Sequence, residues 1–240
     1  MNKKDSTPGK LFLIPTTLGD NEPLEVLPMS VKQAIEEIDY YIVENEKTAR
    51  HFIKKIHPRK SQPSLHLEQL NKFTEPERIP SFLDPCLEGH NVGVLSEAGS
   101  PGVADPGADV VRIAHEKNIK VVPMVGPSSI LLALMASGLN GQQFAFNGYL
   151  PIETSERKSA LKSLERISKE KNQTQIFIET PYRNDKLFQD LIKSLSGTTL
   201  LCVAADITLA NEFIMTKPIH AWKNTTIDLH KRPAIFLIHA

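Results

Sequence analysis

Three short loops rich in small residues carry the strongest chemical signal in this sequence of 240 residues. They are residues 15–20 (Pro-Thr-Thr-Leu-Gly-Asp), residues 96–102 (Ser-Glu-Ala-Gly-Ser-Pro-Gly) and residues 125–129 (Val-Gly-Pro-Ser-Ser). Glycine lets a backbone approach a ligand closely and present its N–H and C=O groups to it. Ordinary turns also favour Gly, Pro and Ser, so one such loop alone would favour a plain turn. Three of them together favour a shared binding pocket.

Motifs for several other chemistries are absent from the sequence. It contains no G-x-G-x-x-G, no G-x-x-x-x-G-K-[ST], no G-x-S-x-G and no H-E-x-x-H. Its eight histidines are scattered, and Cys86 and Cys202 fit no metal-ligand or redox spacing. We therefore expect neither a bound metal nor a disulfide scaffold.

Short apolar runs precede the three loops, at residues 10–14, 91–96 and 119–124, and such runs are typical of buried strands. A further run at residues 40–43, with segments of helical spacing in between, makes strands alternate with helices. This alternation predicts a parallel sheet with right-handed crossovers. Ligands bind such sheets at the carboxyl ends of the strands, where the three loops are expected to lie.

Local signals predict where two of the helices begin. Ser30 and Gln33 have capping-box spacing and predict a helix start at Ser30. Asp105 is expected to be the N-cap of the helix after the second loop, with Pro106 as its first residue. Residues 58–85 are polar and rich in proline, and they predict a surface region with one helix near its end.

The second half of the chain repeats the alternation of strands and helices. Strands are expected at residues 144–146, 176–178, 200–204, 212–215 and 234–239, and helices at residues 128–137, 155–171 and 187–195. The loop at residues 125–127 is the natural boundary between the halves. We therefore predict two α/β domains, residues 1–125 with a mainly parallel sheet and residues 126–240 with a mixed sheet.

Composition and charge limit the possible partners. With 28 basic and 28 acidic residues the net charge is zero, which gives no overall attraction to nucleic acid or to acidic membranes. The charge is slightly uneven, because the first predicted domain is net −3 and the second net +3. The uncharged stretch at residues 121–152 is interrupted by Pro and Gly, and it predicts a buried strand, loop and helix rather than a membrane span. The apolar run after the basic residues 1–10 is too short for a signal peptide, so we expect a soluble cytoplasmic protein.

Six segments of the sequence resemble successive motifs of the tetrapyrrole (corrin/porphyrin) methylase superfamily. They are residues 10–20, 44–50, 95–107, 123–129, 148–151 and 177–183. The most specific is Leu95–Gly107, and the branch that the chain resembles most is that of the small-subunit ribosomal RNA ribose 2′-O-methyltransferases. The resemblance implies a two-domain α/β homodimer that binds S-adenosylmethionine in the cleft between its domains.

The resemblance also implies a set of residues that contact the cofactor. They lie in the small-residue loops and in three further places of the chain: Pro15, Ala98, Gly99, Ser100, Val103, Ala104, Ser128, Ser129, Glu179 and Ala234. Methyl transfer from a sulfonium is an in-line displacement that needs no metal and no covalent enzyme intermediate. Catalysis would then come mainly from holding the acceptor against the methyl group.

Transfer to a ribose hydroxyl also needs a base for the departing proton. Glu44, directly after the predicted strand at residues 40–43, is the candidate base, although a structural carboxylate is an equally good interpretation. Arg50 and Arg183 could bind the substrate phosphates or pair with acidic side chains, and for Arg183 a surface salt bridge is the simpler alternative. One charged helix face could contact RNA backbone or be merely solvated. Its members are Arg157, Lys158, Lys162, Arg166 and Lys169.

Departures from the family pattern leave the acceptor open. Residues 17–20 stand where this branch usually has Pro-Ile-Gly-Asn, residues 44–47 where it has Glu-Asp-Thr-Arg, and Glu97 where it has Asp. The cofactor loops agree better with the family pattern than residues 44–47, the segment that faces the substrate side in relatives. The methyl donor is therefore better supported than the RNA acceptor. A small-molecule methylase of tetrapyrrole type and a non-catalytic relative that binds the cofactor remain as alternatives.

Overall fold

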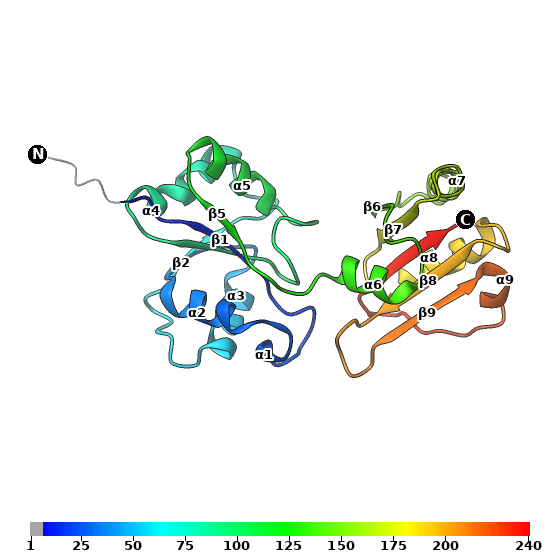
Figure 1. The fold of residues 1–240 in the computed structure, drawn as a ribbon, viewed down its shortest axis with the longest axis horizontal. Helices are drawn as coiled ribbons and strands as arrows, with labels where there is room; N and C mark the ends of the chain where they lie inside the picture. Colours follow the sequence, from blue (N-terminus) through cyan, green and yellow to red (C-terminus); the bar gives the residue numbers. More distant parts are fainter. Residues whose placement is uncertain (1–6) are drawn as a thin grey trace, which may run out of the picture. The chain divides into compact units, whose positions relative to one another are not determined.

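The computed structural model describes residues 7–240, which form two compact units (Figure 1). The first unit ends at Ser128 and the second runs from Ser129 to Ala240. Residues 1–6, which carry part of the basic N-terminal stretch, lie outside the described residues.

The first unit is built on a fully parallel sheet of five strands. The strands are β1 (Leu11–Ile14), β2 (Tyr40–Val43), β3 (His66–Gln69), β4 (Val92–Leu95) and β5 (Val121–Pro123). They are arranged in the order β3-β2-β4-β1-β5, and every neighbouring pair is parallel. Strand β1 therefore lies between β4 and β5, both of which come much later in the chain.

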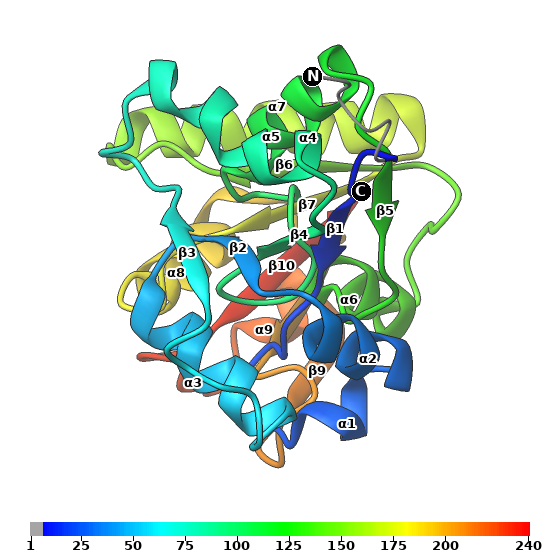
Figure 2. The ribbon, with the colours of Figure 1, turned by 90° about the vertical axis from the view of Figure 1, so that its left-hand side faces the viewer.

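Helices cover both faces of this sheet (Figure 2). They are α1 (Pro23–Val26), α2 (Met29–Glu37), α3 (Glu46–Ile56), the 3₁₀ helix η1 (Pro76–Leu83), α4 (Asp84–Leu87) and α5 (Gly107–Glu116). Successive side chains of a strand point to opposite faces, so Leu11 and Ile14 of β1 serve two separate cores. Leu11 packs in one cluster with residues of η1 and α5, and Ile14 in another with residues of α2 and α3.

The second unit contains a mixed five-stranded sheet. Its strands are β6 (Phe144–Tyr149), β7 (Thr174–Ile178), β8 (Leu200–Ala205), β9 (Phe213–Pro218) and β10 (Ala234–His239). Their order is β6-β7-β10-β8-β9, and only the β6–β7 pair is parallel. The prediction of two α/β units, one with a parallel and one with a mixed sheet, is therefore confirmed.

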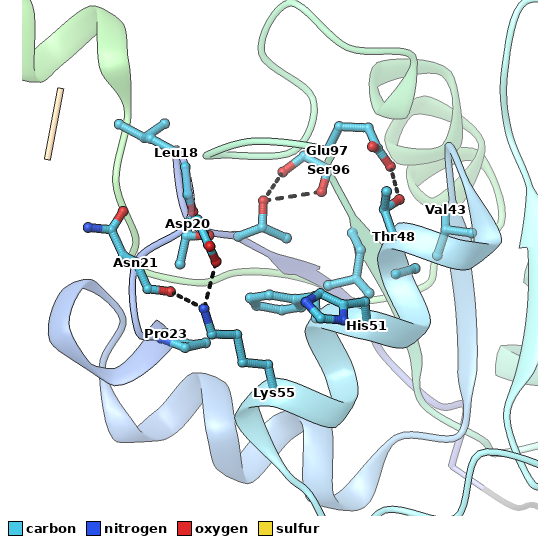
Figure 3. Close-up of a pocket in the computed structure, with 16 residues that line it drawn as sticks. Leu18, Asp20, Asn21, Pro23, Val43, Thr48, His51, Lys55, Ser96 and Glu97 are labelled. Atoms are coloured by element: carbon cyan, nitrogen blue, oxygen red, sulfur yellow. Dashed lines mark hydrogen bonds and ion pairs between the residues drawn. The ribbon is translucent and has the colours of Figure 1, made fainter. Parts of the chain in front are cut away.

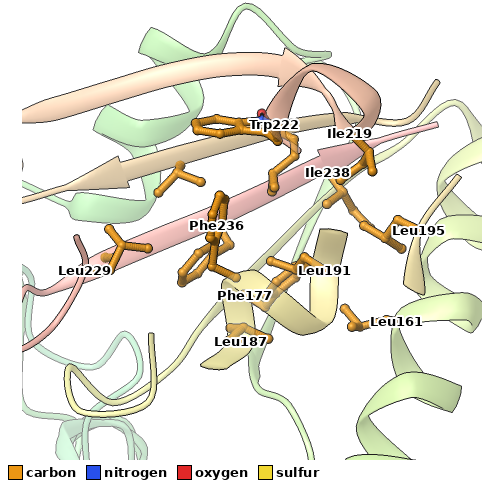
Figure 4. Close-up of a cluster of buried hydrophobic side chains, with 14 of the residues drawn as sticks. Leu161, Phe177, Leu187, Leu191, Leu195, Ile219, Trp222, Leu229, Phe236 and Ile238 are labelled. Atoms are coloured by element: carbon orange, nitrogen blue, oxygen red, sulfur yellow. Dashed lines mark hydrogen bonds between the residues drawn. The ribbon is translucent and has the colours of Figure 1, made fainter. Parts of the chain in front are cut away.

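The helices of the second unit are α6 (Ser129–Ser137), α7 (Thr154–Lys171), α8 (Asn184–Ser194) and α9 (Ile219–Trp222). The core between sheet and helices contains the fully buried rings of Phe177, Phe236 and Trp222 (Figure 4). The indole N–H of Trp222 donates a hydrogen bond of 2.9 Å to the carbonyl of Leu201, which satisfies the only polar group of that buried ring. No helix in the described part of the chain is long and apolar enough to cross a membrane.

Two predicted helix starts are wrong by a residue or two. Helix α2 begins at Met29, Pro28 is its N-cap, and no side chain caps it, so the Ser30 capping box does not form. Helix α5 begins at Gly107 rather than at Pro106. The Asp105 carboxylate accepts the N–H groups of Gly102 and Gly107, at 2.6 and 2.8 Å, and therefore closes the preceding loop as well as the helix end.

The predicted outward face of α7 is wrong at one position. Arg157 is only 2% exposed, because its guanidinium turns inward to Asp190 of α8 at 2.5 Å. It also donates to the carbonyls of Pro151 and Ile152, at 3.1 and 2.6 Å. The four other basic residues of that face are exposed, as expected.

Candidate functional site

The parallel sheet brings the predicted loops of the first unit to one edge. Ile14 and Val43 both pair with Leu95, and Leu13 pairs with Pro123, so the carboxyl ends of these strands lie side by side. Seven predicted site residues lie in the loops that follow those ends: Pro15, Ala98, Gly99, Ser100, Val103, Ala104 and Ser128. The edge carries the small-residue loops, as the sequence predicts.

The loop after β4 is fastened to both neighbouring loops through Gly99 and Ser100. The Gly99 carbonyl accepts the Thr16 N–H at 2.9 Å and the Ser96 hydroxyl at 2.6 Å. The Ser100 hydroxyl donates to the Pro127 carbonyl at 3.3 Å. These contacts hold three separate loops as one surface.

Glycine is required at position 99 for two reasons. Its φ is +74°, a left-handed conformation that side chains disfavour. A Cβ atom there would lie 3.0 Å from Leu18 Cδ2 and 3.1 Å from the Pro127 carbonyl oxygen. Further along the loop, Gly102 and Ala104 also have positive φ values, of +78° and +60°. Val103 and Ala104 are exposed there, so the backbone between them is accessible to a ligand.

A cavity of about 280 Å³ opens over the carboxyl ends of β1, β2 and β4 (Figure 3). Its apolar lining comes from Val43, Ala49, Phe52 and Leu95 among others. Its polar lining comes from the loop after β1, from α3 and from the loop after β4, and it includes Thr16, Thr17, Asp20, Thr48, His51, Lys55 and Glu97.

Hydrogen bonds made by Lys55 and Thr48 help to order the polar rim of this cavity (Figure 3). The Lys55 ammonium lies 2.9 Å from an Asp20 carboxylate oxygen and 2.9 Å from the Asn21 carbonyl, which ties the loop after β1 to α3. Lys55 thereby lowers the pKa of the Asp20 carboxyl. Across the cavity, the Thr48 hydroxyl donates to Glu97 Oε1 at 2.7 Å.

The predicted base Glu44 follows β2 and is half-buried. It does not line the 280 Å³ cavity; it lines a much smaller one of about 10 Å³ that it shares with Asp105. Burial raises the pKa of the Glu44 carboxyl, and the charges of Asp105 and Glu97 add to the effect. The backbone N–H of Glu97 bonds to this carboxylate and acts in the opposite direction.

Arg50 lies on α3, outside the lining of the 280 Å³ cavity. Its guanidinium meets Glu46 at 2.8 Å and donates to the Gln62 carbonyl at 2.6 Å. These contacts join α3 to the segment that follows it.

The remaining predicted residues belong to the second unit. Ser129 is the first residue of α6. Glu179 directly follows β7 and Ala234 begins β10, and the pairing of Ile178 with Ile235 places these two residues next to each other. The Glu179 carboxylate accepts from Arg183 at 2.6 Å, so Arg183 forms a salt bridge, but with a buried partner and not with a surface carboxylate as expected.

Sequence reasoning missed the side chains that α3 contributes to the cavity. Thr48, His51, Phe52 and Lys55 recur at the spacing of one helix face, which was the available signal. Among the described residues, no group of three or more His, Cys, Asp or Glu side chains could hold a metal ion.

Solved structures with this fold include methyltransferases. Diphthine synthase aligns with a TM-score of 0.66 at 14% identity, over 96% of this chain and 89% of that one. The methyltransferase CobJ aligns with a TM-score of 0.64 at 16% identity, over 96% of this chain and 94% of that one. At these identities the likeness establishes the fold alone, which is one that known methyltransferases adopt.

Two curated relatives match over nearly the whole chain, and a third matches over three quarters of it. The ribosomal RNA small subunit methyltransferase I of Vibrio cholerae is 27% identical, over 95% of this chain and 76% of the relative. The protein of the same name from Escherichia coli O157:H7 is 28% identical, over 98% of this chain and 79% of the relative. A third, from Streptococcus pyogenes serotype M6, is 31% identical over 75% of this chain and 59% of the relative.

The family described as Tetrapyrrole (Corrin/Porphyrin) Methylases matches residues 10–221. The chain is therefore a methyltransferase. It belongs to the tetrapyrrole (corrin/porphyrin) methylase family. The family and the enzyme class predicted from the sequence are confirmed.

Proposed function

We propose that this enzyme transfers a methyl group from S-adenosylmethionine to a ribose 2′-hydroxyl of small-subunit ribosomal RNA. The observation that carries the proposal is the match, over 95% and 98% of this chain, to two relatives that are named ribosomal RNA small subunit methyltransferase I. The ribose 2′-hydroxyl is the acceptor that the sequence motifs imply.

The loop after β4 supports S-adenosylmethionine as the donor. Gly99 is buried, and a Cβ atom there would meet Leu18 and Pro127, so glycine lets the three loops pack together and fixes the shape of this surface. Ala98 and Val103 are exposed in the same loop. When bound, the cofactor supplies a methyl group on a positively charged sulfur. The chain's part is to hold the cofactor, mainly with backbone groups of this loop, and to orient the acceptor.

Residues of both units contribute to the proposed site. Pro15, Ala98, Gly99, Ser100, Val103, Ala104 and Ser128 of the first unit would contact the cofactor, with Ser129, Glu179 and Ala234 of the second. Support for the second group comes from the adjacent positions of Glu179 and Ala234 at one edge of the mixed sheet.

Three charged residues complete the sequence-based proposal for the acceptor. Arg50 and Arg183 would bind substrate phosphates, although each already contacts a carboxylate of its own unit. Glu44 is a candidate proton acceptor at the end of β2.

We further propose that the enzyme is a cytoplasmic homodimer. Exposed apolar side chains of the second unit, among them Leu131, Met135 and Ile152, are 51–77% exposed and offer surface for a partner. Light scattering on the purified protein tests the dimer, and a monomer at all concentrations would contradict it.

Two measurements test the proposed function. Calorimetry should show binding of S-adenosylmethionine, and complete absence of binding would contradict the donor. Ribose methylation of small-subunit RNA should differ at one site between wild type and a strain that lacks the gene. If every site is unchanged while the cofactor still binds, the acceptor is wrong and a small-molecule acceptor takes its place.

A further inference from the structure

The 280 Å³ cavity is slightly below the range of about 300–1,000 Å³ that is usual for small-molecule sites, and its lining is more polar than in most of them. Phe52 and Leu95 supply apolar surface for a flat ring, and hydroxyl, carboxylate and amino groups surround it. One lining residue, Glu97, belongs to the loop that is proposed to hold the cofactor and directly precedes Ala98, the first proposed cofactor contact in that loop. Glu97 is therefore the carboxylate that the cavity shares with that loop.

The two carboxylates that line the cavity differ in their partners. Asp20 is 2.9 Å from the Lys55 ammonium, so its charge is compensated by a cation. Glu97 Oε1 instead accepts a hydrogen bond of 2.7 Å from the neutral Thr48 hydroxyl. The Thr48 hydroxyl orients the Glu97 side chain and engages only Oε1, which leaves Oε2 for a ligand.

Glu44, the base predicted from the sequence, is less well placed to meet a ligand in this cavity. It lines the 10 Å³ cavity beside Asp105 and not the larger one, so a nucleoside in the larger cavity would meet Glu97 instead. The position of Glu97 on the exposed side of its loop also leaves it accessible to an incoming ligand.

We propose that the cavity over β1, β2 and β4 receives the acceptor nucleoside and that Glu97, oriented by Thr48, accepts the proton of the hydroxyl that becomes methylated. This inference rests on the proposed function. As the acceptor oxygen bonds to the methyl carbon, the carbon–sulfur bond of S-adenosylmethionine breaks and its electron pair stays on sulfur. The hydroxyl proton passes to the Glu97 carboxylate and then to water. Glu97 is thus a catalytic residue and Thr48 a positioning residue.

The test compares variants of the full-length enzyme on small ribosomal subunits isolated from a strain that lacks the gene. Glu97→Gln keeps an oxygen that can accept the Thr48 hydrogen bond but loses the basic carboxylate. We expect the single-turnover rate to fall about 10²- to 10⁴-fold, the range for removal of a general base. Affinity for S-adenosylmethionine in calorimetry and affinity for the subunits in filter binding should stay within about threefold of wild type.

Two further variants separate catalysis from structure. Thr48→Val removes the orienting hydroxyl with little change of shape, and we expect a smaller loss of rate, about tenfold, with cofactor affinity again unchanged. Glu37→Gln is the matched control, because Glu37 is an exposed carboxylate at the end of α2 in the same unit and does not line the cavity. It should leave the rate unchanged.

The outcomes that contradict the inference are distinct from those that contradict the proposed function. If wild type methylates the subunits and Glu97→Gln keeps more than half of the rate, Glu97 is not the base. A loss of rate in Glu44→Gln combined with full activity in Glu97→Gln would return the role to Glu44. If wild-type enzyme binds the cofactor but methylates no ribosomal RNA, the proposed acceptor is wrong.

Discussion

Replacing Gly99 with alanine tests how closely the backbone of the proposed cofactor loop is packed. Two costs are expected, and the structure separates them. At φ +74° an alanine adopts a left-handed conformation, which costs about 1–2 kcal/mol. The new Cβ would also lie 3.0 Å from Leu18 Cδ2 and 3.1 Å from the Pro127 carbonyl oxygen, so the loops must move apart.

Gly102 provides a matched control for the first cost. Its φ is +78°, but a Cβ there would have no heavy atom within 4 Å. Gly102→Ala should therefore lower the free energy of unfolding only by the cost of the left-handed conformation, about 1–2 kcal/mol. Gly99→Ala should lose about 1–3 kcal/mol more, the usual cost of overpacking. A domain of ordinary stability, about 5–15 kcal/mol, remains folded in both cases.

Urea denaturation measures the two losses, and calorimetry measures S-adenosylmethionine binding by each variant. We expect Gly99→Ala to bind at least tenfold more weakly than wild type, which corresponds to about 1.4 kcal/mol. Equal destabilisation by the two substitutions would refute the close approach at Gly99. Undiminished cofactor affinity in a folded Gly99→Ala protein would refute the placement of the cofactor loop.

Three other predictions concern buried charge and burial. Arg157→Met should lower the free energy of unfolding in urea by about 3–5 kcal/mol, because it leaves the Asp190 carboxylate buried and unpaired. The double variant Arg157→Met/Asp190→Leu should recover part of that loss. A loss below about 1 kcal/mol in the single variant would contradict this. Because burial raises the pKa of Glu44 above 4.5 in the folded state, wild type should lose stability as pH rises through that pKa. The melting temperature of Glu44→Gln should therefore exceed that of wild type at about pH 7.5 and equal it at about pH 4. A difference in melting temperature that grew on acidification would contradict this. The Cys86 thiol is fully buried, and burial raises its pKa to about 11. It should therefore not react with a thiol reagent at about pH 8 until guanidinium unfolds the chain. Rapid labelling of Cys86 in the native protein would contradict this.

The buried strands were the part of the fold that the sequence predicted best. The strands at Tyr40–Val43 and Ala234–His239 match their predicted bounds, because a strand buried on both faces is a continuous apolar run. Strand β3 was missed for the opposite reason. His66–Gln69 is an edge strand that is mostly exposed and polar, so its pairing with β2 leaves no hydrophobic signal.

Polar interactions between distant segments could not be predicted. Arg157 has the sequence context of a solvated helix face, and only the approach of Asp190 on α8 makes its burial favourable. The same holds for the site. The loop around Gly99 was identified from its residue types, whereas the hydrogen bond between Thr48 and Glu97 depends on a sheet register that joins separate parts of the chain.

The place of β1 in its sheet has a consequence for how the protein is made. Leu11 of β1 pairs on one side with Val92 of β4 and on the other with Val121 of β5. The first strand of this unit to be translated therefore cannot pair until its last two strands have been translated. Until β4 and β5 leave the ribosome, both edges of β1 have no native partner. Unpaired strand edges and distant pairings slow folding and favour association with other chains. We therefore expect the first unit to fold only when β5 is complete, and the edges of β1 to need protection on the ribosome until then.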